Sequence, residues 1–143
     1  MFALSIFYGC VVDYASTTEL RICNNSAHDV SVFCLMPRVA DVPIGFTIES
    51  GSEYKWERSV MDDVAEFPRL FRVLVSFDNQ MFVLHQLSDG DAYHNFCEES
   101  FYEVKQTDKR HRRYTFTFTD EDYEYALANP APDDVIEEVV GVE

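Results

Sequence analysis

Residues 70–87 read LFRVLVSFDNQMFVLHQL, and this stretch decides the fold. Two apolar runs, Leu70–Phe77 and Met81–Leu87, flank the short polar connection Asp78–Gln80. Apolar runs of this length that are rich in Val and Phe, and are joined by a few turn-forming residues, are typical of a β-hairpin. We therefore expect two antiparallel strands here.

The segments on both sides of this hairpin have the same character. Short β-type runs occur at Leu20–Cys23, Val30–Met36, Ile44–Ile48, Glu53–Arg58, Phe101–Gln106 and Tyr114–Thr119. The last run (YTFTFT) alternates most regularly, and Gly51 suits a turn that needs a positive φ. Seven or eight strands, spaced by roughly 8 to 15 residues and without a helical pattern of ten residues, predict an all-β fold. We expect an antiparallel β-sandwich of two sheets over residues 17–119.

The composition fits one domain that carries an acidic C-terminal segment. The chain has 143 residues, of which 47% are hydrophobic, enough for a single core. Its formal net charge is −15, and residues 120–143 contain nine acids and no Lys or Arg. Because Asn129–Pro132 (NPAP) interrupts regular structure and the acids repel one another, we expect residues 120–143 to form a flexible tail. So acidic a chain repels nucleic acids and anionic membranes, which favours a protein partner.

The first residues resemble a secretory leader. Residues 1–12 (MFALSIFYGCVV) are apolar and uncharged, and the small residues Ala15 and Ser16 follow shortly after. An apolar run of this length suits a leader and is too short to span a membrane, so we predict a signal peptide over residues 1–16 and no membrane insertion. A buried first strand is the alternative. In a secreted chain, the sequon Asn24-Asn25-Ser26 would make Asn24 a glycan acceptor.

No motif indicates catalysis or a cofactor. The chain lacks a nucleophile signature, and its four histidines are scattered at His28, His85, His94 and His111. The cysteine spacing does not match a zinc site, and the Asp89-Gly90-Asp91 segment fits a turn better than a calcium loop. With 26 acids, a pair of carboxylates carries no information about glycoside hydrolysis. We expect a protein that is not an enzyme and that binds no metal or cofactor.

Six short segments occur in a set order between Leu20 and Val104. They are Ile22–Asn25 (ICNN), Phe33–Cys34, Asp41–Gly45 (DVPIG), Ile48–Trp56 (IESGSEYKW), Leu70–Val73 (LFRV) and the stretch from Cys97 through Val104. In their order and spacing they resemble the motifs of the plant self-incompatibility S1 family of small secreted proteins. The resemblance implies a secreted β-sandwich that binds a receptor through its loops and has no catalytic residues.

The cysteines depart from that family's pattern. Leader cleavage would remove Cys10 and leave an odd set, which predicts one disulfide and one spare thiol without fixing the pair. Val73 stands where the family has a cysteine, and Ser100 lies close to another such position. The resemblance therefore implies a disulfide between Cys34 and Cys97.

These observations predict a secreted, non-catalytic binding or signalling protein. We expect it to recognise a protein partner through loops that include Ser59–Arg69 and Ser88–Asn95. The alternative is an intracellular interaction module. Residues 20–26 (LRICNNS) resemble a segment of the von Hippel–Lindau β-domain, and the acidic tail could mimic a polyanion and bind a basic protein surface. The basic run 109–113 is expected to be a solvated loop.

Overall fold

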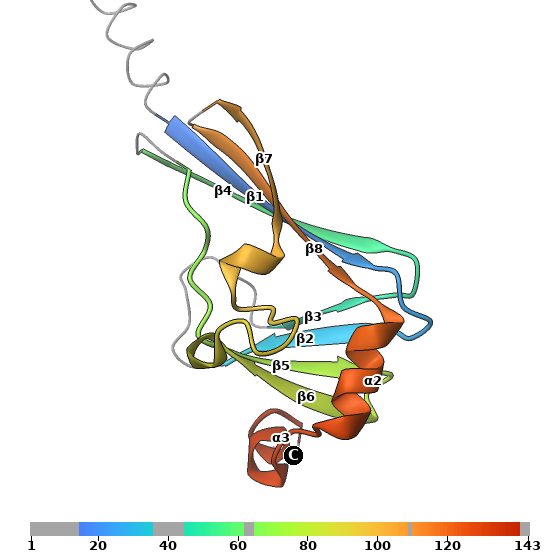
Figure 1. Ribbon diagram of the computed structural model, residues 1–143. Helices are drawn as coiled ribbons and strands as arrows, with labels where there is room; N and C mark the ends of the chain where they lie inside the picture. Colours follow the sequence, from blue (N-terminus) through green and yellow to red (C-terminus); the bar gives the residue numbers. More distant parts are fainter. Residues whose placement is uncertain (1–14, 36–44, 62–64, 109, 141–143) are drawn as a thin grey trace, which may run out of the picture.

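The structure is a computed structural model that describes residues 15–35, 45–61, 65–108 and 110–140 (Figure 1). The chain is mostly β and forms two four-stranded sheets. The first sheet has the order β4-β1-β8-β7 and consists of β1 (Ala15–Asn24), β4 (Glu53–Met61), β7 (Glu103–Asp108) and β8 (His111–Phe118). The second has the order β3-β2-β5-β6 and consists of β2 (Val30–Cys34), β3 (Gly45–Ile48), β5 (Arg72–Phe77) and β6 (Met81–Gln86).

Four short helical elements complete the described fold. The 3-10 turns η1 (Leu87–Asp89) and η2 (Glu99–Phe101) lie between β6 and β7. The helices α2 (Asp120–Ala128) and α3 (Asp133–Val139) follow β8. None of the helices in the described residues is long and apolar enough to cross a membrane.

The predicted hairpin is confirmed. Strands β5 and β6 pair antiparallel from Arg72 opposite Gln86 to Phe77 opposite Met81. Asp78 and Asn79 in the connection have φ values of 57° and 56°. Asp and Asn tolerate this left-handed conformation better than most residues, and two successive positive φ values give the turn a twist that matches the strands.

The expectation of purely antiparallel sheets is wrong at one position. Strand β1 pairs antiparallel with β4 but parallel with β8, with Leu20 opposite Trp56 on one side and Tyr114 on the other. Parallel neighbours require a long connection, and the whole second sheet lies between β1 and β8 in the sequence. Period-2 alternation shows that YTFTFT is a strand but carries no information on its direction.

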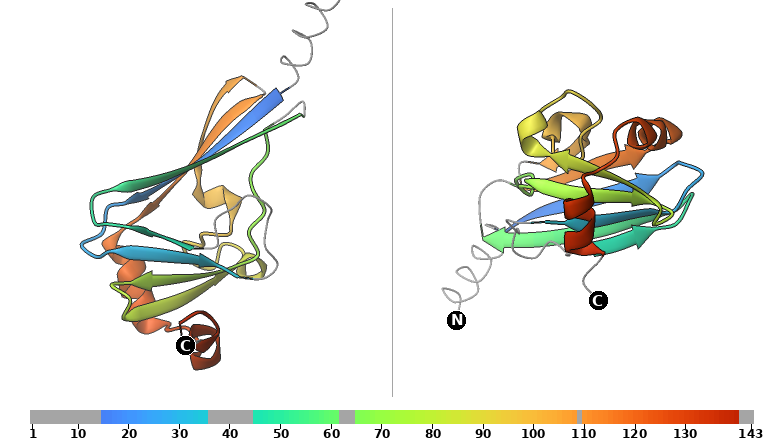
Figure 2. Two further views of the ribbon diagram at one scale, coloured as in Figure 1. Left: turned by 180° about the vertical axis from the view of Figure 1, so that it is seen from behind. Right: turned by 90° about the horizontal axis from the view of Figure 1, so that it is seen from below.

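The inner faces of both sheets share one core. Ile22 and Phe116 of the first sheet and Val32 and Val75 of the second are fully buried in one cluster. Figure 1 and the left view of Figure 2 show that the sheets lie close together at the end near α2 and diverge toward the other end. At the diverging end, residues 65–71, which lead into β5, and the turn η2 lie between the sheets.

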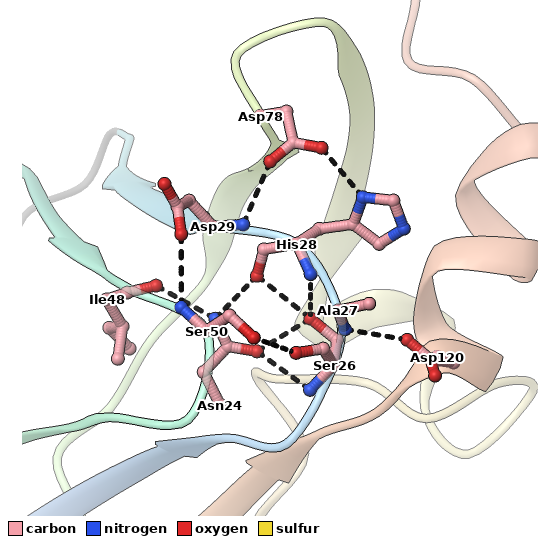
Figure 3. Close-up of polar contacts among 9 residues, drawn as sticks. All are labelled: Asn24, Ser26, Ala27, His28, Asp29, Ile48, Ser50, Asp78 and Asp120. Atoms are coloured by element: carbon pink, nitrogen blue, oxygen red, sulfur yellow. Dashed lines mark hydrogen bonds and ion pairs between the residues drawn. The ribbon is translucent and has the colours of Figure 1, made fainter.

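A buried asparagine joins the turns at the narrow end (Figure 3). Asn24 is fully buried, and its Nδ2 donates to the carbonyl oxygens of His28 (2.7 Å) and Ile48 (2.8 Å). Its Oδ1 accepts hydrogen bonds from the Ser26 backbone N–H (3.0 Å) and hydroxyl (2.7 Å). Both hydrogens of the amide that was predicted to carry a glycan are therefore engaged inside the protein, and a glycan on this nitrogen would not fit the fold.

The same group of polar residues extends to the other turns and to α2. The Asp78 carboxylate accepts from the Asp29 backbone N–H (2.9 Å) and contacts the His28 ring at 2.7 Å. The hydrogen bond with His28 lowers the pKa of Asp78 below its usual value. The Asp120 carboxylate accepts from the Ala27 backbone N–H at 2.8 Å. The first residue of α2 is thus tied to the turn between β1 and β2.

The expectation of a flexible tail from residue 120 is wrong for its described part, which ends at Val140. A capping box begins α2, in which the Thr119 N–H donates to the Asp122 carboxylate at 2.9 Å. Tyr123 stacks on His28 with the ring centroids 3.8 Å apart, and Ala126 is fully buried. Of the acids of these helices, Asp122 is buried and the others are exposed, while the few apolar residues between them pack on the domain.

The start of β1 also bears on the predicted leader. This strand begins at Ala15, and Ser16 is buried opposite Val60. Cleavage after residue 16 would therefore remove the first two residues of the strand. Residues 1–14, which make up nearly all of the predicted leader, lie outside the described residues.

Candidate functional site

A cleft of about 450 Å³ opens where the two sheets diverge. One wall is the described part of the connection between β4 and β5, residues 65–71, which is called the β4–β5 connection below, and the other is the segment between β6 and β7. The lining residues are Glu66, Phe67, Arg69, Leu70, Leu87, Cys97, Glu98, Glu99, Arg112 and Tyr114. They come from four separate parts of the sequence, which only the fold brings together.

The β4–β5 connection is held against the inner face of the first sheet. The Thr18 hydroxyl donates to the carbonyl oxygen of Glu66 at 2.9 Å. The Phe67 ring meets the rings of Tyr102 and Tyr114 edge-on, with centroids 4.8 and 5.1 Å apart. Edge-to-face contacts of this kind are favourable. Leu70, which is buried, completes the attachment. This wall of the cleft is therefore built on fixed side chains.

The opposite wall is shaped by Asn95. This residue is fully buried, and its Nδ2 donates to the carbonyl oxygens of Gln86 (2.6 Å) and Gly90 (2.9 Å). Its Oδ1 accepts from the Cys97 N–H at 3.0 Å. The side chain thus ties the end of β6 to the segment that carries Cys97 and Glu98 into the cleft.

Beneath this wall lies a buried histidine. His85 is 2% exposed, and its Nδ1 accepts a hydrogen bond from the Phe96 N–H at 2.8 Å, which requires the neutral ring with its proton on Nε2. Burial lowers the pKa of His85 to about 3, so the ring is uncharged at neutral pH. A neutral ring held by a backbone N–H is a structural part of the wall.

The floor of the cleft is apolar and chemically inert. Cys97 is 1% exposed, and its thiol lies 3.6 Å from the His85 carbonyl oxygen. Burial raises the pKa of Cys97 to about 12, so the nucleophilic thiolate does not form near neutral pH. The neighbouring Tyr114 is also buried. The apolar surface that a ligand can reach comes from Phe67 and Leu87, which are half-buried and also line the cleft.

The rim of the cleft carries both signs of charge. Glu66, Arg69 and Glu99 are exposed, and Glu98 and Arg112 are half-buried. The Arg112 guanidinium is held in place by Nε–H donation to Gln106 Oε1 (3.0 Å) and by a 3.3 Å contact with the Tyr114 hydroxyl. An apolar floor with a charged rim of both signs suits a polypeptide segment better than a single charged metabolite.

A second hollow of about 440 Å³ lies beside α2. His94 is its central residue, with Nδ1 2.8 Å from the Asp122 carboxylate and the ring stacked on Phe116 at 4.2 Å. The Asp122 carboxylate also closes the capping box of α2. Because this carboxylate holds both His94 and the start of α2, the histidine and aspartate pair seats the helix on the domain.

The two loops that the sequence predicts as contact loops coincide with the cleft only in part. Of the two predicted contact loops, Ser59–Arg69 contributes Glu66, Phe67 and Arg69, whereas Ser88–Asn95 contributes no lining residue. Leu87 and Cys97–Glu99, which flank that second loop, line the cleft instead. Arg112 belongs to the basic run that was expected to be a solvated loop. It lies within β8, and its position opposite Gln106 in β7 places it at the cleft.

The predicted Cys34–Cys97 disulfide is not formed in the structure. Cys23, Cys34 and Cys97 are free thiols, and the described residues contain no disulfide. Cys97 nevertheless belongs to the main core and Cys34 packs against it, and the two are close enough that a charge on Cys34 raises the pKa of Cys97. In the strand register, Val73 lies between Cys34 on one side and His85 on the other.

Neither the known protein families nor the curated proteins provide a relative of this chain. No protein-family model matches this chain, and no curated protein matches it. Within the part of the chain that the structure describes, no group of three or more His, Cys, Asp or Glu side chains could hold a metal ion. The site must therefore be interpreted from its own geometry.

Proposed function

We propose that this chain is a non-catalytic binding protein that takes a short segment of a protein partner into the cleft between the β4–β5 connection and the β6–β7 segment. The observation that carries the proposal is the combination of an apolar floor with fixed walls and a rim of both charges. Such a surface can bury one or two apolar side chains while pairing the polar groups around them.

The chemistry of the floor supports binding over catalysis. Cys97 is the only thiol among the lining residues, and its raised pKa keeps it protonated. The nearest histidine, His85, is buried and hydrogen-bonded to the backbone at Nδ1. Neither side chain has the accessible, ionisable form that nucleophilic catalysis needs.

Two double variants that both preserve the net charge test the cleft. In the cleft variant, Arg69→Glu is combined with Glu99→Arg, which exchanges two exposed rim charges. In the control, Lys55→Glu is combined with Glu57→Lys on the outer face of β4. A phage library of random 12-residue peptides is selected on the wild-type chain, and the enriched peptides are titrated against all three proteins.

The proposal predicts that the cleft exchange weakens the selected peptides by about tenfold or more, whereas the control exchange leaves them unchanged. Peptides that bind all three proteins equally would place recognition elsewhere and refute the use of the cleft. A selection that enriches no peptide would also count against a peptide-binding site.

We further propose that the chain acts outside the cell, on a β-sandwich scaffold like that of the S1 family. The apolar leader over residues 1–16 and the order of the S1-type motifs support this part of the proposal. Intact mass measured on protein from a eukaryotic secretion host tests it. Loss of the leader from the secreted product is expected. An uncleaved chain would reject secretion.

The acidic C-terminal helices favour a second candidate function, the binding of a basic protein surface. Seven of their acids are exposed: Asp120, Glu121, Glu124, Asp133, Asp134, Glu137 and Glu138. Binding to poly-L-lysine should weaken steeply between about 50 and about 300 mM NaCl. It should also fall when Asp134, Glu137 and Glu138 are replaced by their amides. If the same three amide replacements at Glu57, Asp91 and Glu103 reduce binding equally, the effect is net charge alone.

A further inference from the structure

The outer faces of the two sheets differ in chemistry. On the first sheet the outward side chains are largely charged, including Glu19, Arg21, Glu53, Lys55 and Arg113, and several of them pair with one another. A sheet face that meets water is expected to be polar in this way. The second sheet breaks the expectation, because its outward side chains include Phe33, Leu74, Phe82 and Leu84. Such a face needs a cover.

Helix α3 provides that cover. Ala131 and Val135 are buried against Leu35 and Leu74, and they form a cluster separate from the main core. Ile136 and Val139 pack against the same cluster. In Figure 1, α3 lies below the second sheet, on the side away from the first. The helix therefore presents apolar residues at positions i, i+1 and i+4, a spacing that puts them on one face.

The attachment of α3 is weak. The helix has seven residues, and Pro132 at its N-cap provides no side-chain hydrogen bond. Isolated helices of this length are not stable in water, so packing alone holds it. Glu137 and Glu138 lie near its C-terminus, where the helix dipole disfavours negative charge. One backbone hydrogen bond, from the Ala131 N–H to the Phe82 carbonyl oxygen (2.8 Å), anchors the linker to the edge strand β6.

We propose that the outer face of the second sheet is a docking surface for a short acidic amphipathic helix of a partner, and that α3 occupies this surface until the partner displaces it. The occupant seen in the structure defines the ligand, which has apolar residues at i, i+1 and i+4 and acidic residues between them. Arg72 lies two residues before Leu74 on β5 and therefore on the same face. It adds a positive charge beside the apolar patch, which complements an acidic helix.

Because α3 is covalently attached, it competes at a high effective concentration. A free helix of the same pattern therefore binds the intact chain poorly and binds well once α3 is released. The surface is separate from the cleft, so this proposal does not depend on the function proposed above.

The test uses the full chain and one defined probe, a fluorescent peptide with the sequence of residues 129–143 (NPAPDDVIEEVVGVE). Val135→Asp combined with Ile136→Asp releases α3 by placing two charges against the apolar face. The matched control is Leu127→Asp combined with Val104→Asp, which adds the same charges outside α3 at side chains that are 43% and 50% exposed. The release variant is expected to bind the peptide about tenfold or more tightly than the wild type and the control. A peptide carrying the same two aspartates at 135 and 136 should not bind.

Circular dichroism and urea unfolding show whether the β fold survives in the release variant. A lost β spectrum would show that α3 is an integral part of the core and would overturn the proposal. Equal peptide binding by all three proteins, or none by the release variant, would overturn it as well. A wild-type dimer that dissociates in the release variant would identify the occupant as α3 of a second copy, against the partner helix proposed here.

Discussion

Replacing Asn24 with alanine should remove a large part of the stability of this protein. The substitution deletes the amide that accepts from the Ser26 backbone N–H and donates to the Ile48 and His28 carbonyl oxygens. The His28 carbonyl keeps a hydrogen bond from the Ser26 hydroxyl, at 3.0 Å. The Ile48 carbonyl and the Ser26 N–H lose the contacts that Asn24 makes with them in a buried site.

The magnitude follows from these two groups. Each buried polar group left unsatisfied costs about 1–3 kcal/mol, so we expect the free energy of unfolding to fall by about 2–6 kcal/mol. A domain of this kind has a total stability of about 5–15 kcal/mol. Asn24→Asp should also destabilise, because a carboxylate oxygen would then face two carbonyl oxygens. Asn25→Ala is the matched control, since the neighbouring side chain is exposed and its loss should change stability by less than about 0.5 kcal/mol.

Urea unfolding monitored by the fluorescence of Trp56 measures these differences. Trp56 is the sole tryptophan of the chain and is 8% exposed, so its emission should shift on unfolding. The midpoint should fall for Asn24→Ala while the slope stays that of the wild type. A loss below about 1 kcal/mol, or an equal loss for Asn25→Ala, would refute the claim that Asn24 organises the narrow end.

Three further predictions concern His85, the cysteines and Gly90. His85 titrates at about 6.5 when unfolded and at about 3 when folded, so only the unfolded state gains its proton between these values and the free energy of unfolding falls as the pH drops. The Asn side chain of His85→Asn can still accept a hydrogen bond from the Phe96 N–H but does not titrate. Between about pH 7 and about pH 5, urea titrations should therefore show a fall in the free energy of unfolding that is about 2 kcal/mol smaller for this variant than for the wild type. Parallel pH profiles would contradict this. Burial raises the pKa of Cys34 to about 11 and that of Cys97 to about 12, so both thiols should react with a disulfide reagent such as DTNB only after unfolding. The partly exposed Cys23 should react first. Thiols that appear only after reduction would contradict this and indicate a disulfide. Gly90 has φ 59° and ψ −131°, so Gly90→Ala should cost about 1–3 kcal/mol in thermal unfolding, and an unchanged midpoint would argue against strain there.

The strands could be predicted from the sequence because alternation reports directly on burial. In β8, Tyr114, Phe116 and Phe118 are buried while the residues between them are partly exposed, as the pattern YTFTFT indicates. Strand direction could not be predicted, since a parallel neighbour and an antiparallel one bury the same side chains. The cleft could not be predicted from the sequence either, because Arg69 and Arg112 are 43 positions apart and line the same cleft only as a result of the fold.

Residues 120–143 were predicted to be a flexible tail because the prediction relied on their charge density and gave too little importance to their few apolar residues. Repulsion among the acids argues for disorder only where nothing buries the residues between them. Here all the described acids except Asp122 are exposed, while Ala126 and Val135 are buried. The four residues Thr119–Asp122 also match a capping box, which uses acids at the start of a helix. The −9 charge of residues 120–143 is therefore compatible with two helices.

The sequence of strand β5 indicates that the outer face of the second sheet is covered. In RVLVSF, the residues Val73, Val75 and Phe77 face the main core, but Leu74 is also fully buried although it points to the opposite side. A strand that meets water on one face alternates, whereas a strand buried on both faces is apolar at successive positions. The run from Val73 to Val75 thus requires material on the outer face of the second sheet. The acidic C-terminal segment supplies that material through α3, so its apolar residues, more than its charges, determine where it lies.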